Sequence, residues 1–160
     1  MSEFIFEAAG ERDTDHLGAL LAAALPTSAT IALCGTLGAG KTRLVQAIAA
    51  ACGIPRQEVV SPTFVLCHEY HGSRIIYHLD AYRLASADEL LALGIEEYFA
   101  ADALTIIEWA DRITPALPPD HLQITIDITG ESFRRFTITS AGSQLAKMVA
   151  TLQTQMTNDK

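Results

Sequence analysis

Basic residues are scarce in this sequence. Lysine and arginine together number 11, against 19 aspartate and glutamate residues, and the formal net charge is −8. Proteins that hold DNA or RNA by themselves usually present a basic face to the phosphates. The acidic balance therefore argues against a large nucleic-acid footprint on this chain alone. It leaves open a subunit that assists a nucleic-acid enzyme without holding the nucleic acid itself.

Paired cysteines, long apolar runs and the pattern of a signal peptide are also lacking. Cys34, Cys52 and Cys67 show no C-x-x-C spacing, which is typical of reduced, buried thiols. A membrane-spanning helix needs about 18 or more consecutive apolar residues, and no stretch approaches that length. The N-terminus, MSEFIFEAAGERD, has no basic start followed by an apolar run, as a signal peptide would. We therefore expect a cytoplasmic protein with no membrane contact.

The length and composition suit one domain. The chain has 160 residues, of which 49% are hydrophobic, so it can bury a full core. No linker, repeat or low-complexity block divides it. We expect a single domain over residues 1–160, with the last residues, about 156–160, disordered.

The apolar pattern predicts strands separated by helices. Strands are expected at residues 3–8, 29–35, 64–70, 74–80, 103–109, 121–129 and 134–140. Helices are expected at 14–25, with Thr14 as the N-cap, at 41–53, at 86–99, and weakly from 143 onward. The short connections HGS and GES predict two hairpins. The fold class that follows is α/β, with a mixed, mostly parallel central sheet flanked by helices.

The segment GTLGAGKT matches the phosphate-binding pattern G-x-x-x-x-G-K-[ST] through Gly35, Gly40, Lys41 and Thr42. Glycines let a loop wrap a phosphate without a Cβ in the way, and the following helix presents its positive end. The lysine supplies a cation to the outer phosphates, and the threonine offers a hydroxyl to Mg²⁺. Because the motif follows a buried strand and opens a helix, we favour a nucleotide site over a glycine-rich turn.

Such a loop normally has a second Mg²⁺ anchor, an acid at the end of a neighbouring buried strand. Two residues qualify, Asp80 after RIIYHL and Glu108 after LTII. Between the phosphate-loop helix and the next strand lies SPTF, residues 61–64. Ser61 and Thr63 are placed either to sense the outer phosphate, as in GTPase-like proteins, or merely to cap the backbone.

The segments GTLGAGKT, SPTF, HLDAYRL, LGIEEYF and IIEW occur in an order and spacing that resemble the TsaE (YjeE) family, the ATPase component of bacterial tRNA threonylcarbamoyladenosine biosynthesis. The resemblance covers roughly residues 14–138. It implies a P-loop NTPase fold, ATP and Mg²⁺ as ligands, and ATP hydrolysis that is slow alone and stimulated by partners. The implied partner is the TsaB–TsaD heterodimer, which modifies the adenosine next to the anticodon and is reset by this hydrolysis. Contact with tRNA is expected to be mainly indirect, through that complex.

The resemblance also implies the site residues. The residues expected to bind the nucleotide are Thr14, Gly38, Ala39, Gly40, Lys41, Thr42, Arg43, Ser61, Thr63, Trp109 and Arg134. Thr42 and Glu108 match the Mg²⁺ positions, and Lys41, Asp80 and Glu108 are expected to be catalytic, with Asp80 near the γ-phosphate or its water. The chain departs from many family members at Thr36, where they carry an acid. That change removes one negative charge near the phosphates and no ligand.

The sequence leaves several assignments open. Trp109, taken without the resemblance, is more typical of a packed core or edge aromatic. His68, His71 and His78 share no ligand spacing with the cysteines, so satisfied or exposed histidines are favoured over a zinc site. Either Asp80 or a residue of SPTF would orient the water. The absence of N-K-x-D favours ATP over GTP.

Two other functions compete with the ATPase subunit. One is a nucleotide-dependent interaction module, in which ATP binding orders SPTF and DAYRL to hold a partner and hydrolysis is incidental. The other is a small-molecule kinase, which ranks last because no basic lid segment is present in the sequence.

Overall fold

The computed structural model describes residues 2–62 and 66–158. Its centre is one seven-stranded sheet, ordered β1-β7-β6-β2-β5-β4-β3. The strands are β1 (Glu3–Ala8), β2 (Ala29–Gly35), β3 (Cys67–His71), β4 (Ile75–Asp80), β5 (Leu104–Glu108), β6 (His121–Ile128) and β7 (Arg134–Ala141). The four neighbours β6, β2, β5 and β4 are parallel, while β7 and β3 run against them and β1 runs against β7. Five of the seven strands therefore share one direction, which confirms the predicted mixed, mostly parallel sheet.

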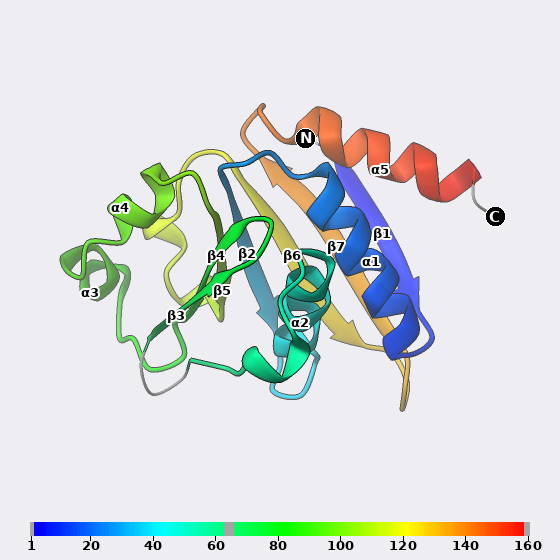
Figure 1. Cartoon of the computed structure of the whole chain (residues 1–160), viewed down its shortest axis with the longest axis horizontal. Coiled ribbons are helices and arrows are strands. Elements are labelled where there is room, and N and C mark those ends of the chain that lie inside the picture. The colour runs from blue at the N-terminus through cyan, green and yellow to red at the C-terminus, as the bar shows by residue number, and fades with distance from the viewer. Residues whose placement is uncertain (1, 63–65, 159–160) are drawn as a thin grey trace.

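Helices cover both faces of this sheet. The helices α1 (Glu11–Ala24) and α2 (Lys41–Ala51) lie in front of the strands in Figure 1, with α5 (Ala146–Asn158) toward β1. Residues of all three helices share one apolar core with alternate residues of the strands, such as Ile31 and Ile106. The intervening strand residues, such as Ala32 and Ile107, face α3 (Ala87–Ala92), α4 (Ile95–Ala100) and the 3-10 helices η2 (Ala110–Arg112) and η3 (Thr114–Ala116). This alternation is what a sheet buried on both faces requires.

Three sequence expectations are wrong at element boundaries. Helix α1 begins at Glu11, so Thr14 is a buried residue inside it and not its N-cap. The N-cap is Gly10, and the Asp13 carboxylate accepts a hydrogen bond from the Ala9 N–H at 2.7 Å, which satisfies the chain just before the helix. The expected helix 86–99 is two short helices, because Gly94 adopts a left-handed φ of 82° between them.

The third correction concerns the C-terminus. Helix α5 reaches Asn158, so residues 156–158 are helical where disorder was expected. The physical reason lies in packing, since Met156 contacts the apolar core. No helix among residues 2–62 and 66–158 is both long enough and apolar enough to span a membrane.

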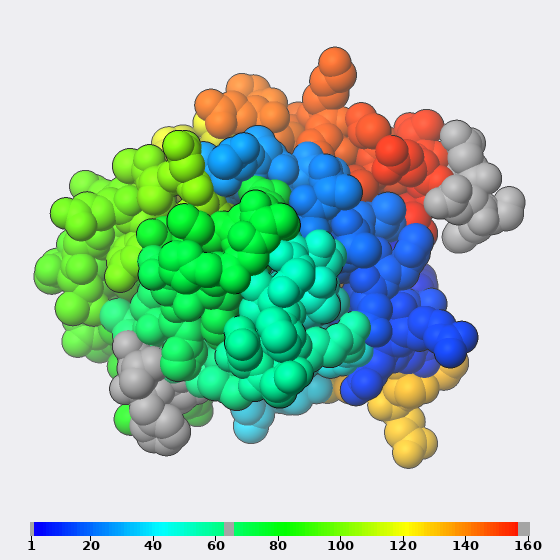
Figure 2. Space-filling view, in the orientation of Figure 1, coloured from blue at the N-terminus to red at the C-terminus, as the bar shows by residue number. Residues whose placement is uncertain are grey.

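The β3–β4 hairpin closes over the ends of α1 and α2. The Arg74 Nη1 atom donates to the carbonyls of Ala22 and Leu25, at 3.2 Å and 3.0 Å. The backbone at Gly72 comes so close to α2 that a Cβ there would lie 2.2 Å from the Cys52 carbonyl oxygen. Figure 2 shows α1, the α2 region and this hairpin as one continuous surface. The turn of the hairpin thus packs against the C-terminal ends of α1 and α2.

Candidate functional site

The loop between β2 and α2 is shaped to leave space at its inner face. Gly38 and Gly40 adopt positive φ angles of 82° and 109°, which only glycine adopts without strain. A Cβ built on either glycine meets no atom within 4 Å, so the loop opens onto free space. No side chain described in the structure caps the N-terminus of α2, so its first backbone N–H groups remain available. An uncapped helix start behind such a loop is an anion-binding arrangement.

Lys41, the first residue of α2, lies inside this loop and is only 5% exposed. Its Nζ donates to the carbonyls of Gly35 at 2.6 Å and Thr36 at 3.0 Å, which holds the ammonium over the loop. Burial lowers the pKa of Lys41 from its ordinary value, and the charge of Glu108 is the largest influence opposing that shift. An ammonium held in this way has one N–H left to offer a phosphate oxygen.

The ring of Trp109 covers this ammonium. Lys41 Nζ lies 3.8 Å from the ring centroid, within cation–π range. Tyr82 packs against Trp109 with ring centroids 5.0 Å apart, and the Arg112 guanidinium lies 5.0 Å from the Tyr82 ring. Trp109 also has a left-handed φ of 60°, which is unusual for a large side chain. Trp109 therefore lines the site over the Lys41 ammonium and is not an ordinary core aromatic.

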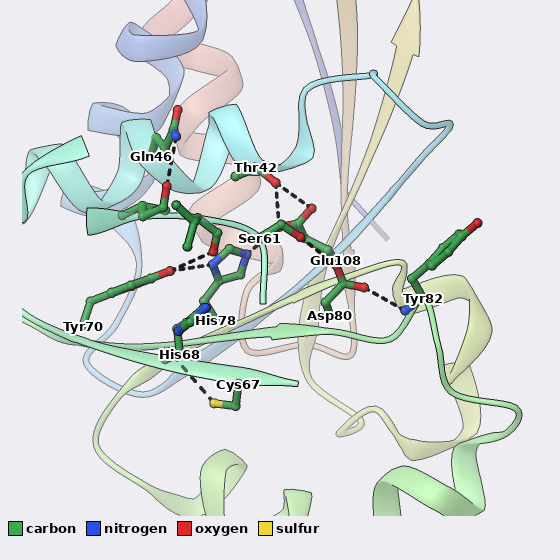
Figure 3. Close-up of polar contacts among 12 residues, drawn as sticks. Thr42, Gln46, Ser61, Cys67, His68, Tyr70, His78, Asp80, Tyr82 and Glu108 are labelled. Atoms are coloured by element: carbon green, nitrogen blue, oxygen red, sulfur yellow. Dashed lines mark hydrogen bonds and ion pairs between the residues drawn. The ribbon is translucent and has the colours of Figure 1, made fainter. Parts of the chain in front are cut away.

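The two predicted acids meet at the carboxyl edge of the sheet. Asp80 and Glu108 end β4 and β5 and pair directly in register. Both are nearly buried, at 4% and 3% exposed. The Thr42 hydroxyl lies 3.0 Å from each carboxylate oxygen of Glu108, as Figure 3 shows. A hydroxyl and a carboxylate facing each other beside the phosphate loop are the oxygen ligands that Mg²⁺ prefers.

Asp80 has a separate set of donors. The Ser61 hydroxyl donates to Asp80 Oδ2 at 2.9 Å, and the Tyr82 backbone N–H donates to Oδ1 at 2.8 Å (Figure 3). Ser61 is therefore tied to a site carboxylate and does not merely cap its own loop. Thr63, the other predicted residue of that loop, lies outside the described residues.

A buried histidine that sequence reasoning assigned no role lies behind Glu108. His78 is fully buried; its Nε2 lies 2.5 Å from Glu108 Oε2 and its Nδ1 lies 3.0 Å from the Tyr70 hydroxyl (Figure 3). Burial raises the pKa of Tyr70 to about 12, so its hydroxyl keeps its proton. The signal in the sequence was the H-x-D spacing, which places His78 and Asp80 on one face of β4.

The structure distributes the predicted residues over two pockets. A pocket of about 460 Å³ is lined by Gly38, Gly40, Lys41, Thr42, Arg43, Ser61, Asp80, Glu108 and Trp109, together with Leu37 and Tyr82. On the other side of the loop, a pocket of about 350 Å³ contains Thr14, Ala39 and Arg134 and shares Gly38, Gly40 and Arg43 with the first. The described members of the predicted set thus lie around the phosphate loop, with Asp80 and Glu108 in the first pocket and Thr14 and Arg134 in the second.

Two of the predicted arginines are already engaged. The Arg43 guanidinium forms an ion pair with Asp15 at 2.7 Å, which ties α2 to α1. Arg134 Nε donates to the Ala39 carbonyl at 3.0 Å, so it braces the phosphate loop from β7. In this state both side chains hold the loop and its helix in place.

The residues present fit a Mg²⁺–nucleotide. No group of three or more His, Cys, Asp and Glu side chains in the described part of the chain is arranged to hold a metal ion. Nucleotide-bound Mg²⁺ needs no such cage, since it takes one or two protein oxygens and completes its shell with phosphates and water. Thr42 and Glu108 supply such oxygens next to a loop that can receive the phosphates.

Comparisons with known proteins agree with this geometry. The sequence model of the family described as "Threonylcarbamoyl adenosine biosynthesis protein TsaE" matches residues 8–136. The "tRNA threonylcarbamoyladenosine biosynthesis protein TsaE" of Treponema pallidum is 34% identical over 127 residues, which are 79% of this chain and 93% of that protein. The protein of the same name from Bacillus subtilis is 36% identical over 145 residues, 90% of each chain. A crystal structure of Bacillus subtilis YdiB superposes with a TM-score of 0.80 at 28% identity, covering 99% of this chain and 97% of that one.

Proposed function

This chain belongs to the TsaE family, and we propose that it is the ATP-binding and slowly hydrolysing subunit of tRNA threonylcarbamoyladenosine formation. The fold is that of the P-loop NTPases. In this proposal the chain works in the cytoplasm with a TsaB–TsaD heterodimer, which carries out the modification of the adenosine next to the anticodon. Hydrolysis resets that complex between turnovers, and tRNA is contacted mainly through the partners.

The observation that carries the proposal is the meeting of Thr42 and Glu108 at 3.0 Å beside the open phosphate loop, with Asp80 on the adjacent strand. A bare anion-binding turn needs no second acid. A site that only held a partner would not need two buried carboxylates aimed at the phosphate position. Phosphoryl transfer to water needs both features, because it depends on positioning and on neutralising phosphate charge.

Each residue then has a physical task. The backbone N–H groups of the loop and the start of α2 bind the phosphate oxygens, and Lys41 neutralises the outer ones. Thr42 and Glu108 hold Mg²⁺, which when bound neutralises charge on the β- and γ-phosphates. Asp80, oriented by Ser61, accepts a hydrogen bond from the attacking water and aligns it. Trp109 packs on the ammonium, and Thr14 and Arg134 flank the nucleotide on the far side of the loop.

The experiment is a reconstitution of this chain with TsaB and TsaD, omitting each component in turn. Asp80→Asn keeps an oxygen that can accept from Ser61 or Tyr82 but removes the charge. We expect nucleotide binding within about threefold of wild type, hydrolysis at least about 100-fold slower, and loss of multiple-turnover modification. Asp127→Asn is the matched control, because Asp127 is an exposed carboxylate on β6 outside both pockets.

Two results would count against the proposal. If Asp80→Asn abolishes hydrolysis and multiple-turnover modification continues at the wild-type rate, the chain is instead a nucleotide-dependent interaction module. If the wild-type chain forms no complex with TsaB and TsaD and its ATPase rate does not rise, the proposed partners are wrong.

A further inference from the structure

A continuous chain of polar contacts runs behind the site, away from the pocket. It begins at Thr42, passes through the Glu108 carboxylate to His78 and ends at the Tyr70 hydroxyl (Figure 3). These four side chains come from α2, β5, β4 and β3, so the chain crosses three neighbouring strands and reaches a helix. His78 and Tyr70 are not among the residues that line the first pocket, and the proposed chemistry gives them no task.

The contacts define where the protons must lie. An ionised carboxylate only accepts hydrogen bonds, so His78 Nε2 must carry the proton that points at Glu108. In a neutral imidazole Nδ1 is then a bare acceptor. The one proton of the Tyr70 hydroxyl has two acceptors within reach, His78 Nδ1 at 3.0 Å and the Val60 carbonyl oxygen at 3.3 Å, and the shorter contact is to His78. Tyr70 thereby selects the tautomer that can donate to Glu108. This is how a second partner fixes the ring that orients a metal ligand.

Burial makes this support necessary. A carboxylate that is 3% exposed loses most of its water, and Thr42 offers only one hydroxyl proton between its two oxygens. A buried carboxylate with a missing donor either rotates toward another donor or is destabilised in its charged form. His78 supplies the missing donor from the side opposite the pocket.

We propose that His78, held by Tyr70, is a positioning residue that orients the Glu108 carboxylate for the divalent cation of the bound nucleotide. The proposal rests on the nucleotide site proposed above. It adds two residues that touch neither nucleotide nor metal and act through Glu108.

The Tyr70 hydroxyl also lies near the loop that carries Ser61. It is 3.3 Å from the Val60 carbonyl oxygen, and Gln46 of α2 donates to the neighbouring Val59 carbonyl at 3.1 Å. The same hydroxyl that orients His78 therefore borders the segment that presents Ser61 to Asp80. The Tyr70 hydroxyl therefore connects the residues that hold Glu108 with the segment that holds Asp80.

The test compares two replacements of one ring. His78→Gln places an amide nitrogen near the position of Nε2 and so keeps a donor toward Glu108. His78→Asn is shorter, places its amide nearer to Nδ1 and leaves Glu108 without a donor. The affinity of each full-length protein for a non-hydrolysable ATP analogue is measured by calorimetry, in EDTA and across a Mg²⁺ series.

We expect the affinity in EDTA to stay within about twofold of wild type in both variants. The Mg²⁺ concentration that gives half of the affinity gain should rise about 10- to 100-fold in His78→Asn and clearly less in His78→Gln. Tyr70→Phe, which keeps the ring and loses only the hydroxyl, should shift it in the same direction by a smaller factor. Tyr70→Phe and His78→Gln keep the test decisive if His78→Asn does not fold.

A second readout needs neither metal nor nucleotide. Long-range ¹H–¹⁵N correlation of the His78 ring should show a protonated Nε2 in the free protein. A bare Nε2 would overturn the proposal, because the ring would then donate nothing to Glu108. Equal Mg²⁺ dependence in wild type, His78→Asn and His78→Gln would overturn it as well. If the nucleotide affinity of the wild-type protein does not respond to Mg²⁺, this proposal and the proposed function fail together. If the wild-type affinity responds to Mg²⁺ and the variants show the same Mg²⁺ dependence, this proposal alone fails.

Discussion

Replacing Gly18 with alanine should destabilise the protein, although alanine is the better helix former. Gly18 is buried in α1 where it crosses α2. A Cβ there would lie 2.5 Å from Ala47 Cβ, 2.7 Å from the Ala47 carbonyl carbon and 2.9 Å from the Ile48 nitrogen. Carbon atoms in ordinary contact are about 3.5–4.0 Å apart, so the helices must separate by roughly 1 Å.

The magnitude follows from two opposing effects. Overpacking of this kind costs about 1–3 kcal/mol, and the upper end applies here because two of the three contacted atoms are backbone and cannot rotate away. The gain in helix propensity from glycine to alanine is about 1 kcal/mol. We therefore expect the free energy of unfolding to fall by about 2 kcal/mol, measured by urea unfolding followed by circular dichroism.

Two control variants separate these effects. Ala19→Gly, at an exposed position of the same helix, measures the propensity effect in reverse. Ala47→Gly removes the 2.5 Å contact but itself costs about 1 kcal/mol as a glycine inside α2. In the Ala47→Gly background, Gly18→Ala should therefore cost less than in wild type, and still more than zero because the backbone contacts remain. A Gly18→Ala protein as stable as wild type, or a double variant as stable as Ala47→Gly alone, would refute the reasoning.

Two further predictions concern other parts of the chain. Gly94→Ala should lower the free energy of unfolding by about 1 kcal/mol and leave nucleotide affinity unchanged. The φ of Gly94 is 82° and no atom lies near the new Cβ, so the cost is purely conformational. Gly94→Asn should cost less in the same denaturation series, because asparagine tolerates a left-handed φ better than alanine does. Burial alone would raise the pKa of Asp15, but hydrogen bonds from Arg56 and Arg43 hold it below its ordinary value of 3.8. The pKa of Asp15 in the folded protein is thus depressed, so the stabilisation from its ion pairs is complete above pH 3.8 and is lost as pH falls below it. Asp15→Asn should lower the free energy of unfolding by at most about 1 kcal/mol at pH 7. Equal losses at pH 7 and in strong acid would contradict an electrostatic origin of this stabilisation.

Local patterns were sufficient to predict the parts of the site that act within one segment. The phosphate loop follows from glycines, Lys41 and Thr42 between a strand and a helix. Asp80 and Glu108 followed from acids at the ends of apolar runs, because parallel strands bring such ends to one edge. The strands were predicted well for a related reason: in a sheet buried on both faces, they appear as short apolar runs.

What the sequence did not reveal depends on pairing between segments. The support from His78 arises only because β4 lies between β3 and β5, with Tyr70 on one neighbour and Glu108 on the other. No spacing within one segment encodes that order. Likewise, the break at Gly94 depends on a left-handed φ, and the helical periodicity of 86–99 continues across it. Thr14 looked like a cap because it precedes the apolar face of α1, yet Asp13 already serves the start of that helix.

The two carboxylates of the site are adjacent yet are held by different parts of the fold. Glu108 is held by Thr42 of α2 and by His78, whereas Asp80 is held by Ser61 and by the N–H of Tyr82. Each acid loses one donor when one of its partners is removed, and a buried group left unsatisfied in this way costs about 1–3 kcal/mol of stability. A change at Glu108 is therefore transmitted to the helix that carries the phosphate loop, and a change at Asp80 to the loop before β3. The two sets approach each other at the Tyr70 hydroxyl, which contacts both His78 and the Val60 carbonyl beside Ser61. Removing a donor of Glu108 should therefore alter metal binding first, and removing the Ser61 hydroxyl should alter the position of the water first.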